Sequence, residues 1–444
     1  MKPKIIVLDD DPTGSQTVHS CLLLTRWDVA TLKTALADAA PLFFVLTNTR
    51  GMDAVRAAAV TREVCLNLKA ALADYAGPVL FVSRSDSTLR GHYPVETDVM
   101  NEVLGPFDAT LLTPAFFEGG RITRDSTHYL VVEGQPVPTH ETEFARDSVF
   151  GYTTAFLPDY VSEKTGGRVA AETVARLTLK DLRAGRAGAW LAGLDGNVVG
   201  AVDGETPEDY ALFAEAALRA AAQGKRLLFR SAASLLTALA KLPPQPVAAE
   251  SFASLVRDGR PGVVIVGSHV AKTTAQLGAL LRERGVVGLP LDVARLPEEH
   301  AALVDALRAG VAHAHARGLT PVVYTSRDER QFANTAERLA FGAAVSAALM
   351  VVVRGLPATL GFLVSKGGIT SNDVLSTGLE LAAARVLGQI LPGVTVVQTP
   401  PWHAIPQLPV VIFPGNVGGD DALAQVYRRL APSRAQARRA KLAA

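Results

Sequence analysis

The chain has 444 residues, of which 48% are hydrophobic and 20% charged, and its formal net charge is +1. These values are typical of a globular protein and argue against extensive disorder. The nearly neutral charge provides no electrostatic footprint for nucleic acid or for an anionic membrane. The length favours two domains of ordinary size over one core.

Neither the first residues nor the cysteine content points to secretion. The chain leads into an apolar segment without a signal-peptide pattern, and Cys21 and Cys65 lack metal-ligand spacing. The longest uncharged stretch, 339–353, has 15 residues, whereas a bilayer span needs about 20. We therefore predict a cytoplasmic protein with buried thiols and no membrane partner.

Short apolar runs alternate with Ala-rich stretches along the chain, which predicts α/β structure with largely parallel sheets. In the first half, strands are predicted at 5–8, 42–46, 79–83, 109–112 and 198–202, and helices at 29–39 and 54–73. In the second half, strands are predicted at 263–266, 286–290, 322–326, 361–365, 394–399 and 410–413, and a helix at 374–387.

A proline cluster at 243–246 is the strongest linker signal, because proline stops helices and stiffens connections. It predicts domains at 1–242 and 243–432, followed by a basic, Ala-rich tail at 433–444. We expect two α/β domains, each a largely parallel or mixed sheet flanked by helices. The ligand cleft is expected between them.

Three consecutive aspartates, Asp9, Asp10 and Asp11, follow the first predicted strand and precede a Pro-Thr-Gly turn. At the carboxyl end of a strand in an open α/β sheet, side chains point into the crevice where ligands bind. Three like charges repel each other unless a metal, a polyol or a proton shares the site. A solvated turn with an aspartate helix cap is the simpler alternative.

A second polar block, 83–92, follows the predicted strand at 79–83 and reads Ser-Arg-Ser-Asp-Ser-Thr-Leu-Arg-Gly-His. Guanidinium groups bind carboxylates in a bidentate manner, and hydroxyl groups suit a polyol. The block therefore indicates an acid-sugar site. A helix start capped by Ser87 or Thr88, with the arginines in water, explains it equally well.

A third block, 363–373, contains Gly367-Gly368-Ile369-Thr370 after a predicted strand. Glycines allow close approach to a phosphate, and helix N-termini favour anions. Two similar junctions, Gly267-Ser268 and Pro414-Gly415-Asn416, also follow predicted strands. Three such junctions suit a nucleotide, although a glycine turn before a helix is common and no Walker A pattern is present.

Together these blocks resemble the four-carbon acid sugar kinase family over nearly the whole chain. The family's Ala-Asp-Asp-Phe-Thr-Gly-Ala is matched at 9–15, and its Lys-x-Asp-Ser-Thr-Leu-Arg-Gly-Asn at 84–92. Further matches are Pro114-Ala115-Phe116, Gly120-Arg121 and 140–145, and then the three C-terminal glycine loops.

The resemblance implies ATP-dependent phosphorylation of a hydroxyl on a four-carbon sugar acid, such as a tetronate or 3-oxo-tetronate. It implies a sugar-acid-binding domain at 1–242 and a nucleotide-binding domain at 243–432, with Asp10, Asp11 and Arg90 as catalytic residues. The implied substrate-binding residues are Asp9, Thr13, Arg84, Asp86, Ser87, Thr88, Gly91, His92 and Glu96. The implied nucleotide-binding residues are Ser268, Gly367, Gly368, Ile369, Thr370, Gly415 and Asn416. Mg²⁺ is expected with ATP because it bridges phosphate oxygens, but the sequence assigns no ligand to it.

The sequence departs from the family on the sugar side, with Asp9 for Ala, Pro12 for Phe, Arg84 for Lys and His92 for Asn. A kinase for a different sugar acid and a non-catalytic sugar-acid sensor are therefore alternatives. An isomerase or dehydrogenase acting on a polyol would need a nicotinamide fingerprint or a metal cluster, and the sequence has neither. The sequence leaves open the substrate, the position phosphorylated and whether the chain forms a homodimer.

Overall fold

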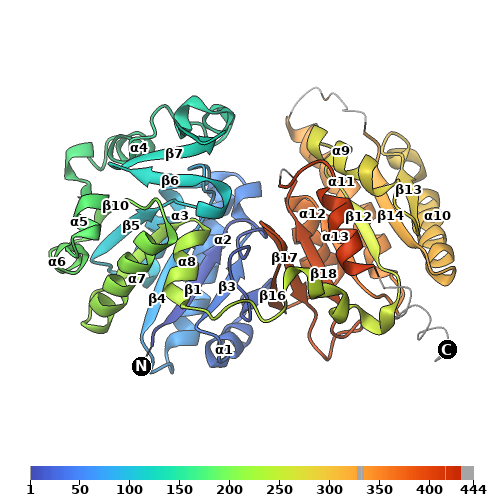
Figure 1. Ribbon diagram of the computed structural model, residues 1–444, viewed down its shortest axis with the longest axis horizontal. Coiled ribbons are helices and arrows are strands. Elements are labelled where there is room, and N and C mark those ends of the chain that lie inside the picture. The colour runs from blue at the N-terminus through green and yellow to red at the C-terminus, as the bar shows by residue number, and fades with distance from the viewer. Residues whose placement is uncertain (1, 328–331, 333–334, 416, 432–444) are drawn as a thin grey trace. The chain divides into compact units, whose positions relative to one another are not determined.

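The structure is a computed structural model that describes residues 2–327, 332, 335–415 and 417–431 (Figure 1). The chain divides into two compact units, Met1–Pro244 and Gln245–Ala444. The C-terminal tail predicted at 433–444 lies outside the described residues. Each unit contains one main sheet with helices, which confirms the predicted α/β class.

The N-terminal unit contains a parallel sheet with strand order β2-β3-β1-β4-β11-β5-β10-β9. Its strands are β1 (Lys4–Asp9), β2 (Leu22–Leu24), β3 (Leu42–Leu46), β4 (Val79–Arg84), β5 (Ala109–Thr113), β9 (Ala175–Leu177), β10 (Val198–Val202) and β11 (Leu227–Ser231). The central strands β1, β3 and β11 are buried along their whole length. Such continuous apolar runs are expected where helices cover both faces of a parallel sheet.

Eight α-helices accompany this sheet among the described residues, and α7 and α8 lie in front of it in Figure 1. They are α1 (Val29–Ala37), α2 (Ala54–Leu72), α3 (Val95–Leu104), α4 (Leu157–Lys164), α5 (Leu179–Arg183), α6 (Ala187–Ala192), α7 (Pro207–Ala222) and α8 (Ala233–Ala240). Local sequence sets their starts. Asp53 caps α2, and Thr206 and Asp209 form a capping box at α7.

A small antiparallel sheet of β6 (Arg121–Arg124), β7 (Thr127–Val132) and β8 (Gln135–Pro138) contacts the loop after β4. The buried His128 makes this contact. Its Nδ1 lies 2.9 Å from Thr123 Oγ1, and its Nε2 lies 2.7 Å from the Ser87 carbonyl oxygen. Burial lowers the pKa of His128 to about 4, so the imidazole stays neutral near neutral pH.

Strand register brings several strand ends to one edge of the N-terminal sheet. Asp9 pairs in register with Leu46 and with Arg84, and Ser231 pairs with Arg84 and with Thr113. The strands that neighbour β1 in space are β3 on one side and β4 on the other. Ligands of open α/β sheets bind at such switch points, outside the carboxyl ends of the strands.

The C-terminal unit has a mixed sheet, in the order β13-β14-β12-β15-β18-β17-β16. Pairs from β13 to β18 are parallel, and the pairs of β17 with β18 and β16 are antiparallel. The strands are β12 (Val263–Val266), β13 (Val286–Leu291), β14 (Thr320–Thr325), β15 (Leu363–Lys366), β16 (Ala383–Leu391), β17 (Val394–Gln398) and β18 (Pro409–Phe413). The α-helices are α9 (Ala271–Leu280), α10 (Leu296–Ala316), α11 (Thr335–Arg354), α12 (Gly368–Asp373) and α13 (Ala422–Leu430). Phe252, Phe362 and Phe413 lie in its core.

The predicted helix at 374–387 is wrong. A π-helix continues α12 only over Val374–Gly378, and β16 begins at Ala383. Within β16, Ala384, Val386, Gly388 and Ile390 are buried while their neighbours are less so, and the strand pairs with β17. Ala-rich composition suggested a helix, but burial with a period of two and pairing with β17 favour a strand.

No helix among the described residues combines the length and apolar character that a membrane crossing requires. Both cysteines are buried. The predicted cytoplasmic location stays a prediction.

Candidate active site

The three aspartates at the end of β1 occupy different environments. Asp9 is fully buried, and Arg84 donates to its Oδ1 over 3.1 Å. Gly14 packs so closely on Asp9 that a Cβ at that position would lie 1.9 Å from Asp9 Oδ2. Burial raises the pKa of Asp9 to about 7, although Arg84 opposes this. Asp9 therefore contacts protein groups beneath the surface of the site.

Asp10 and Asp11 share the guanidinium group of Arg50. Arg50 Nε lies 3.2 Å from Asp10 Oδ2, and Arg50 Nη1 lies 3.4 Å from Asp11 Oδ2. Ser85 donates to Asp10 Oδ2 over 2.6 Å, and the Thr13 N–H donates to Asp11 Oδ1 over 2.8 Å. Burial alone would raise the pKa of Asp11, but Arg50, then Arg84 and Thr13, bring it below its ordinary value.

Arg50 was not predicted from the sequence as a site residue. It lies in the short segment after β3, whose carboxyl end is level with that of β1. Burial opposes its charge, but Asp10, Asp11 and Asp86 together raise the pKa of Arg50 well above its ordinary value. The position of Arg50 directly after a predicted strand was the signal that could have identified it.

The loop after β4 forms the second half of the cluster. Arg90 Nε donates to Asp86 Oδ2 over 2.8 Å, and Arg50 Nη1 lies 4.0 Å from Asp86 Oδ1. Arg90 also stacks on the ring of Phe144, with its Nη1 3.7 Å from Asp147 Oδ2. Thr88 donates to Asp86. Burial would raise the pKa of Asp86, but Arg50 and Arg90 bring it well below its ordinary value.

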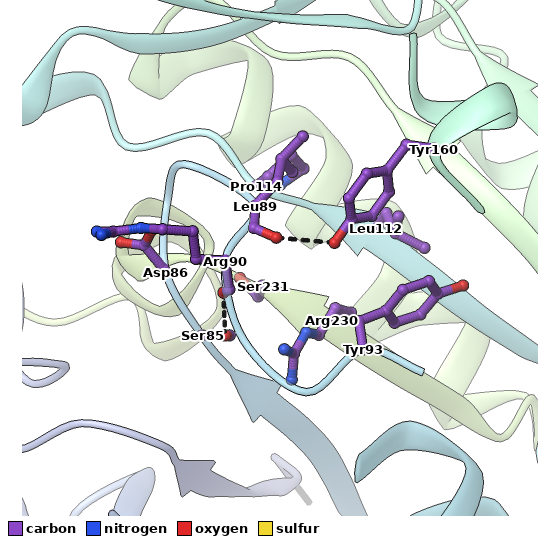
Figure 2. Close-up of a pocket in the computed structure, with 10 residues that line it drawn as sticks. All are labelled: Ser85, Asp86, Leu89, Arg90, Tyr93, Leu112, Pro114, Tyr160, Arg230 and Ser231. Atoms are coloured by element: carbon purple, nitrogen blue, oxygen red, sulfur yellow. Dashed lines mark hydrogen bonds and ion pairs between the residues drawn. The ribbon is translucent and has the colours of Figure 1, made fainter. Parts of the chain in front are cut away.

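A small cavity of about 20 Å³ lies next to this loop (Figure 2). It has room for about one water molecule. Tyr160 donates to the Leu89 carbonyl over 2.8 Å, and Ser85 Oγ lies 3.0 Å from the Arg90 carbonyl oxygen, so the loop around the cavity is held in place. The lining residues are Ser85, Asp86, Leu89, Arg90, Tyr93, Leu112, Pro114, Tyr160, Arg230 and Ser231.

Gly91 has a φ of +127°, which residues with a Cβ rarely adopt. A Cβ there would lie 2.3 Å from Ser85 Oγ and 2.8 Å from Arg230 Nη2. Glycine therefore allows the loop to pass closely over both side chains, and this fixes the position of Arg90.

His92 and Glu96, which were predicted to bind substrate, contact other protein groups. His92 Nε2 lies 2.9 Å from the Met52 carbonyl oxygen, and the ring packs edge-on against Phe150. Glu96 accepts from Thr49 and from Arg230 Nη1, each over 2.6 Å. Both side chains are buried, so they stabilise the loop after β4 through contacts with the protein interior. Ser87 is also buried, and its carbonyl accepts from His128.

Arg230 is a second site residue that the sequence analysis missed. It lies on β11, which was not predicted as a strand, and its Nη1 donates to Ser83 Oγ over 2.7 Å and to Glu96. Burial opposes its charge, but Glu96 and then Asp10 raise the pKa of Arg230. The apolar run at 227–229 before Arg230 was the available signal.

In the C-terminal unit, three glycine loops meet around Ser268, which follows β12. A Cβ on Gly367 would lie 3.1 Å from Ser268 Cβ, and one on Gly415 would lie 3.5 Å from Ser268 Oγ. Thr273 Oγ1 lies 3.1 Å from the Gly415 carbonyl oxygen, to which it can donate, and 3.2 Å from Ser268 Oγ. The loops predicted to bind nucleotide are therefore close together within this unit.

Gly368, Ile369 and Thr370 are consecutive residues at the start of α12, but Ile369 and Thr370 differ in their environment. Thr370 packs against Gly267, where a Cβ would lie 2.2 Å from Thr370 Oγ1. Gly368 begins α12, and Ile369 is 69% exposed. Asn416 lies outside the described residues.

Three cations surround these loops and form no ion pair among the described residues. Arg327 donates from Nη1 to the Ser268 carbonyl over 2.8 Å. Lys366 donates to the Pro414 and Gly415 carbonyls, and Lys272 lies 3.4 Å from the Gly418 carbonyl oxygen. An open hollow of about 660 Å³ lies beside them, lined by His269, Val270, Ala271, Thr274, Ala275 and Arg327. Cations without counter-ions make this part of the unit suitable for an anion.

Within the described ranges, no group of three or more His, Cys, Asp or Glu side chains is arranged to hold a metal ion. Each carboxylate of the N-terminal cluster is instead paired with a guanidinium group, as the contacts of Asp9, Asp10, Asp11 and Asp86 show.

Comparison with family models identifies both units. Residues 5–239 match a sugar-binding N-terminal domain, and residues 263–423 match a nucleotide-binding C-terminal domain. The chain belongs to the four-carbon acid sugar kinase family. This confirms the resemblance found in the sequence.

Two relatives of the family have sequences similar to this chain. A D-erythronate kinase from Heliobacterium modesticaldum is 34% identical over 148 residues, which are 32% of this chain and 32% of that protein. A D-threonate kinase from Bordetella bronchiseptica is 32% identical over 183 residues, which are 39% of this chain and 43% of that protein. The chain thus matches less than half the length of either kinase.

Solved structures of two proteins share the fold. A Haemophilus influenzae protein aligns with a TM-score of 0.64 at 17% identity, and a Salmonella typhimurium LT2 protein with a TM-score of 0.68 at 19% identity. The alignments cover 96% and 97% of this chain, respectively, and 100% of each neighbour.

Proposed function

We propose that the chain is an ATP-dependent kinase that phosphorylates a hydroxyl group of a four-carbon sugar acid such as a tetronate or a 3-oxo-tetronate. The observation that carries this proposal is the cluster of Asp10, Asp11 and Asp86 around Arg50 and Arg90 in the unit that matches a sugar-binding domain. The names of the two relatives support the substrate class.

The exposure of the clustered side chains in the N-terminal unit separates the residues that can contact the sugar acid from those that support them. Arg90 and Arg50 are 25% and 19% exposed, and Asp11 and Asp86 are 21% and 14% exposed. The exposed guanidinium groups can bind the substrate carboxylate, and the exposed carboxylates can accept hydrogen bonds from its hydroxyl groups. Asp11 is the carboxylate best placed to take the proton of the attacking hydroxyl.

Asp10 has a different part in this proposal because its side chain is only 2% exposed. Its oxygens accept from Arg50 and Ser85, so Asp10 holds these two groups in the cluster. Asp9 and Arg84 lie below it. We propose that this buried layer fixes the orientation of the groups that contact substrate.

The C-terminal unit has residues that fit a nucleotide. The backbones of Gly367 and Gly415 come close to Ser268, and glycine loops of this kind let backbone N–H groups approach a phosphate. Arg327, Lys272 and Lys366 supply positive charge, and the exposed Ile369 offers an apolar contact. When bound with Mg²⁺, ATP would supply the phosphoryl group. No described residue is assigned to the metal.

A coupled assay of ADP release over tetronates, 3-oxo-tetronates and pentonates tests the proposal. We expect ATP consumption that depends on a four-carbon sugar acid. If none of the acids stimulates ADP release although ATP binds, the kinase proposal fails and a non-catalytic sensor becomes the better explanation.

Asp11→Asn and Asp10→Asn should each lower kcat by about 100-fold or more, because the first removes the proposed proton acceptor and the second disturbs Arg50. Nucleotide affinity should stay unchanged, since both residues lie in the N-terminal unit. Asp74→Asn, at an exposed acid paired with Lys33, is the control and should keep full activity. Loss of ATP binding in either site variant would mean that the residue is assigned to the wrong substrate.

A further inference from the structure

Lys366, the last residue of β15, is a buried cation directly under the glycine loops of the C-terminal unit. Its side chain is 0% exposed. Its Nζ donates to the Pro414 carbonyl and, over 3.1 Å, to the Gly415 carbonyl, and it lies 4.1 Å from the centroid of the Phe413 ring. The ammonium group therefore sits beneath the turn that follows β18, next to Gly367.

No carboxylate neutralises this ammonium group among the described residues. The charged side chain that acts on it is Lys272 on α9, which has the same sign. From β18 and the following turn it meets the Phe413 ring and two carbonyl oxygens, and none of the described ionisable side chains on α12 pairs with it. Burial first, and then Lys272, lower the pKa of Lys366 to about 7.

The turn after β18 does not need a charged side chain at Lys366 to hold it in place. Backbone carbonyls could be satisfied by a neutral donor, whereas a buried charge without a counter-ion is costly. An anion close to the ammonium group favours its charged form. The anion that the surrounding glycine loops and Arg327 fit is a polyphosphate.

We infer that Lys366 is an electrostatic positioning residue for the phosphates of the nucleotide, and that nucleotide binding restores a proton to its side chain. This inference rests on the proposed nucleotide-binding role of the C-terminal unit. Lys366 acts through its charge from beneath the loop, because its Nζ is enclosed by the protein. A charge in this environment attracts an anion more strongly than one in water.

The protonation of Lys366 determines how nucleotide affinity changes with pH. In the free protein Lys366 loses its proton as the pH rises through about 7, and a nearby anion raises that pKa again. Above this pH the complex therefore binds up to about one more proton than the separate partners, and affinity falls as pH increases. At about pH 8 the nucleotide phosphates are already ionised and contribute little.

Isothermal titration calorimetry of ATP into the full-length wild-type chain at about pH 8 tests this without any variant. In two buffers with different ionisation enthalpies, the observed heats should differ by an amount equal to the uptake of up to about one proton. Binding with equal heats in both buffers would overturn the inference while leaving nucleotide binding intact. If ATP does not bind, the proposed function fails, and this inference fails with it.

Lys366→Met should weaken ATP binding by about 10- to 100-fold and abolish the buffer dependence. The matched control is Lys4→Met, because Lys4 is also buried and donates to two backbone carbonyls, those of Asp38 and Ala40, in the other unit. Lys4→Met should bind ATP with wild-type affinity and wild-type proton uptake. Unchanged affinity and unchanged proton uptake in Lys366→Met would contradict the inference.

Discussion

Asp9, Asp10 and Asp11 are adjacent in the chain but differ in what their carboxylates can do. Asp11 is partly exposed and carries a lowered pKa because Arg50, Arg84 and Thr13 outweigh its burial. Asp10 is enclosed by Arg50 and Ser85. Asp9 is buried against Arg84 and Gly14, and its Oδ2 has no hydrogen-bond partner among the described residues. Exposure thus separates the residue suited to contact substrate from those suited to support it.

Asp9→Asn should flatten the dependence of stability on pH. The folded-state pKa of Asp9 is raised from 3.8 to about 7, so the folded chain binds the extra proton between these values. The free energy of unfolding of the wild type should therefore fall, relative to that of the variant, by a few kcal/mol as the pH rises from about 4 to about 7. Above about pH 7 the difference should stay constant. Urea unfolding of both chains across this range measures the difference. Parallel profiles would show that Asp9 ionises normally.

At this scale the sequence identified residues through strand ends and family motifs. The sequence analysis assigned Asp10, Asp11, Asp86 and Arg90 to one site, and in the structure these side chains form one cluster with Arg50. It missed Arg50 and Arg230 because each belongs to a strand end outside the motifs, and a partner across a sheet cannot be read from local pattern. Lys366 was missed because its significance comes from burial without a counter-ion, which only the packed structure reveals.

At the scale of elements, the loop between β4 (Val79–Arg84) and α3 (Val95–Leu104) determines the geometry of the site. It carries Asp86 and Arg90 and crosses Ser85 and Arg230 at Gly91. Tyr152 and Tyr160 donate to the carbonyls of Thr88 and Leu89, so the loop is anchored from the side of α4 as well. The shape of the sugar site therefore depends on one closely packed connection.

Gly91→Ala should destabilise the chain and lower sugar-acid turnover. The φ of +127° strains any residue with a Cβ, and the new methyl group would clash with Ser85 and Arg230. Gly134→Ala is the matched control, because Gly134 also has a positive φ of +79° but open space around the new methyl group. Thermal unfolding should show that Gly91→Ala costs about 2 kcal/mol more than the control. Equal losses would mean that the close packing at Gly91 is unimportant.

The strands could be predicted where an apolar run is long and bounded by turn residues. The predictions at 42–46, 198–202 and 263–266 agree with β3, β10 and β12 to the residue. The short strands β2 and β9 and the three-stranded sheet β6–β8 were not predicted, because their apolar runs span at most a few residues. For β16, Ala-rich composition favours a helix locally, and pairing with β17 decides otherwise. Long-range pairing is what the sequence alone could not supply.

At the scale of the whole molecule, the two units provide complementary chemistry. The N-terminal unit pairs carboxylates with arginines at a strand-end edge, which suits a hydroxylated acid. The C-terminal unit has glycine loops and cations that form no ion pair within the described part of the chain, which suits a polyphosphate. The proposed kinase needs both, because phosphoryl transfer depends on positioning and charge neutralisation.

Hydrogen exchange on the full chain should separate the two binding functions. A tetronate substrate should protect backbone amides at 10–14 and 85–91, whereas ATP should protect those at 267–270 and 366–371. The amides of each loop are slowed when a ligand orders the surrounding backbone. Protection of the N-terminal loops by ATP alone would contradict the assignment of one ligand to each unit.

The most direct test of the kinase account is phosphorus NMR of the wild-type chain incubated with ATP, Mg²⁺ and D-erythronate or D-threonate. The account predicts a new phosphate-monoester resonance that grows together with ADP and requires the sugar acid. If ATP remains intact with every four-carbon acid, or is converted to inorganic phosphate without a sugar phosphate, the account is contradicted.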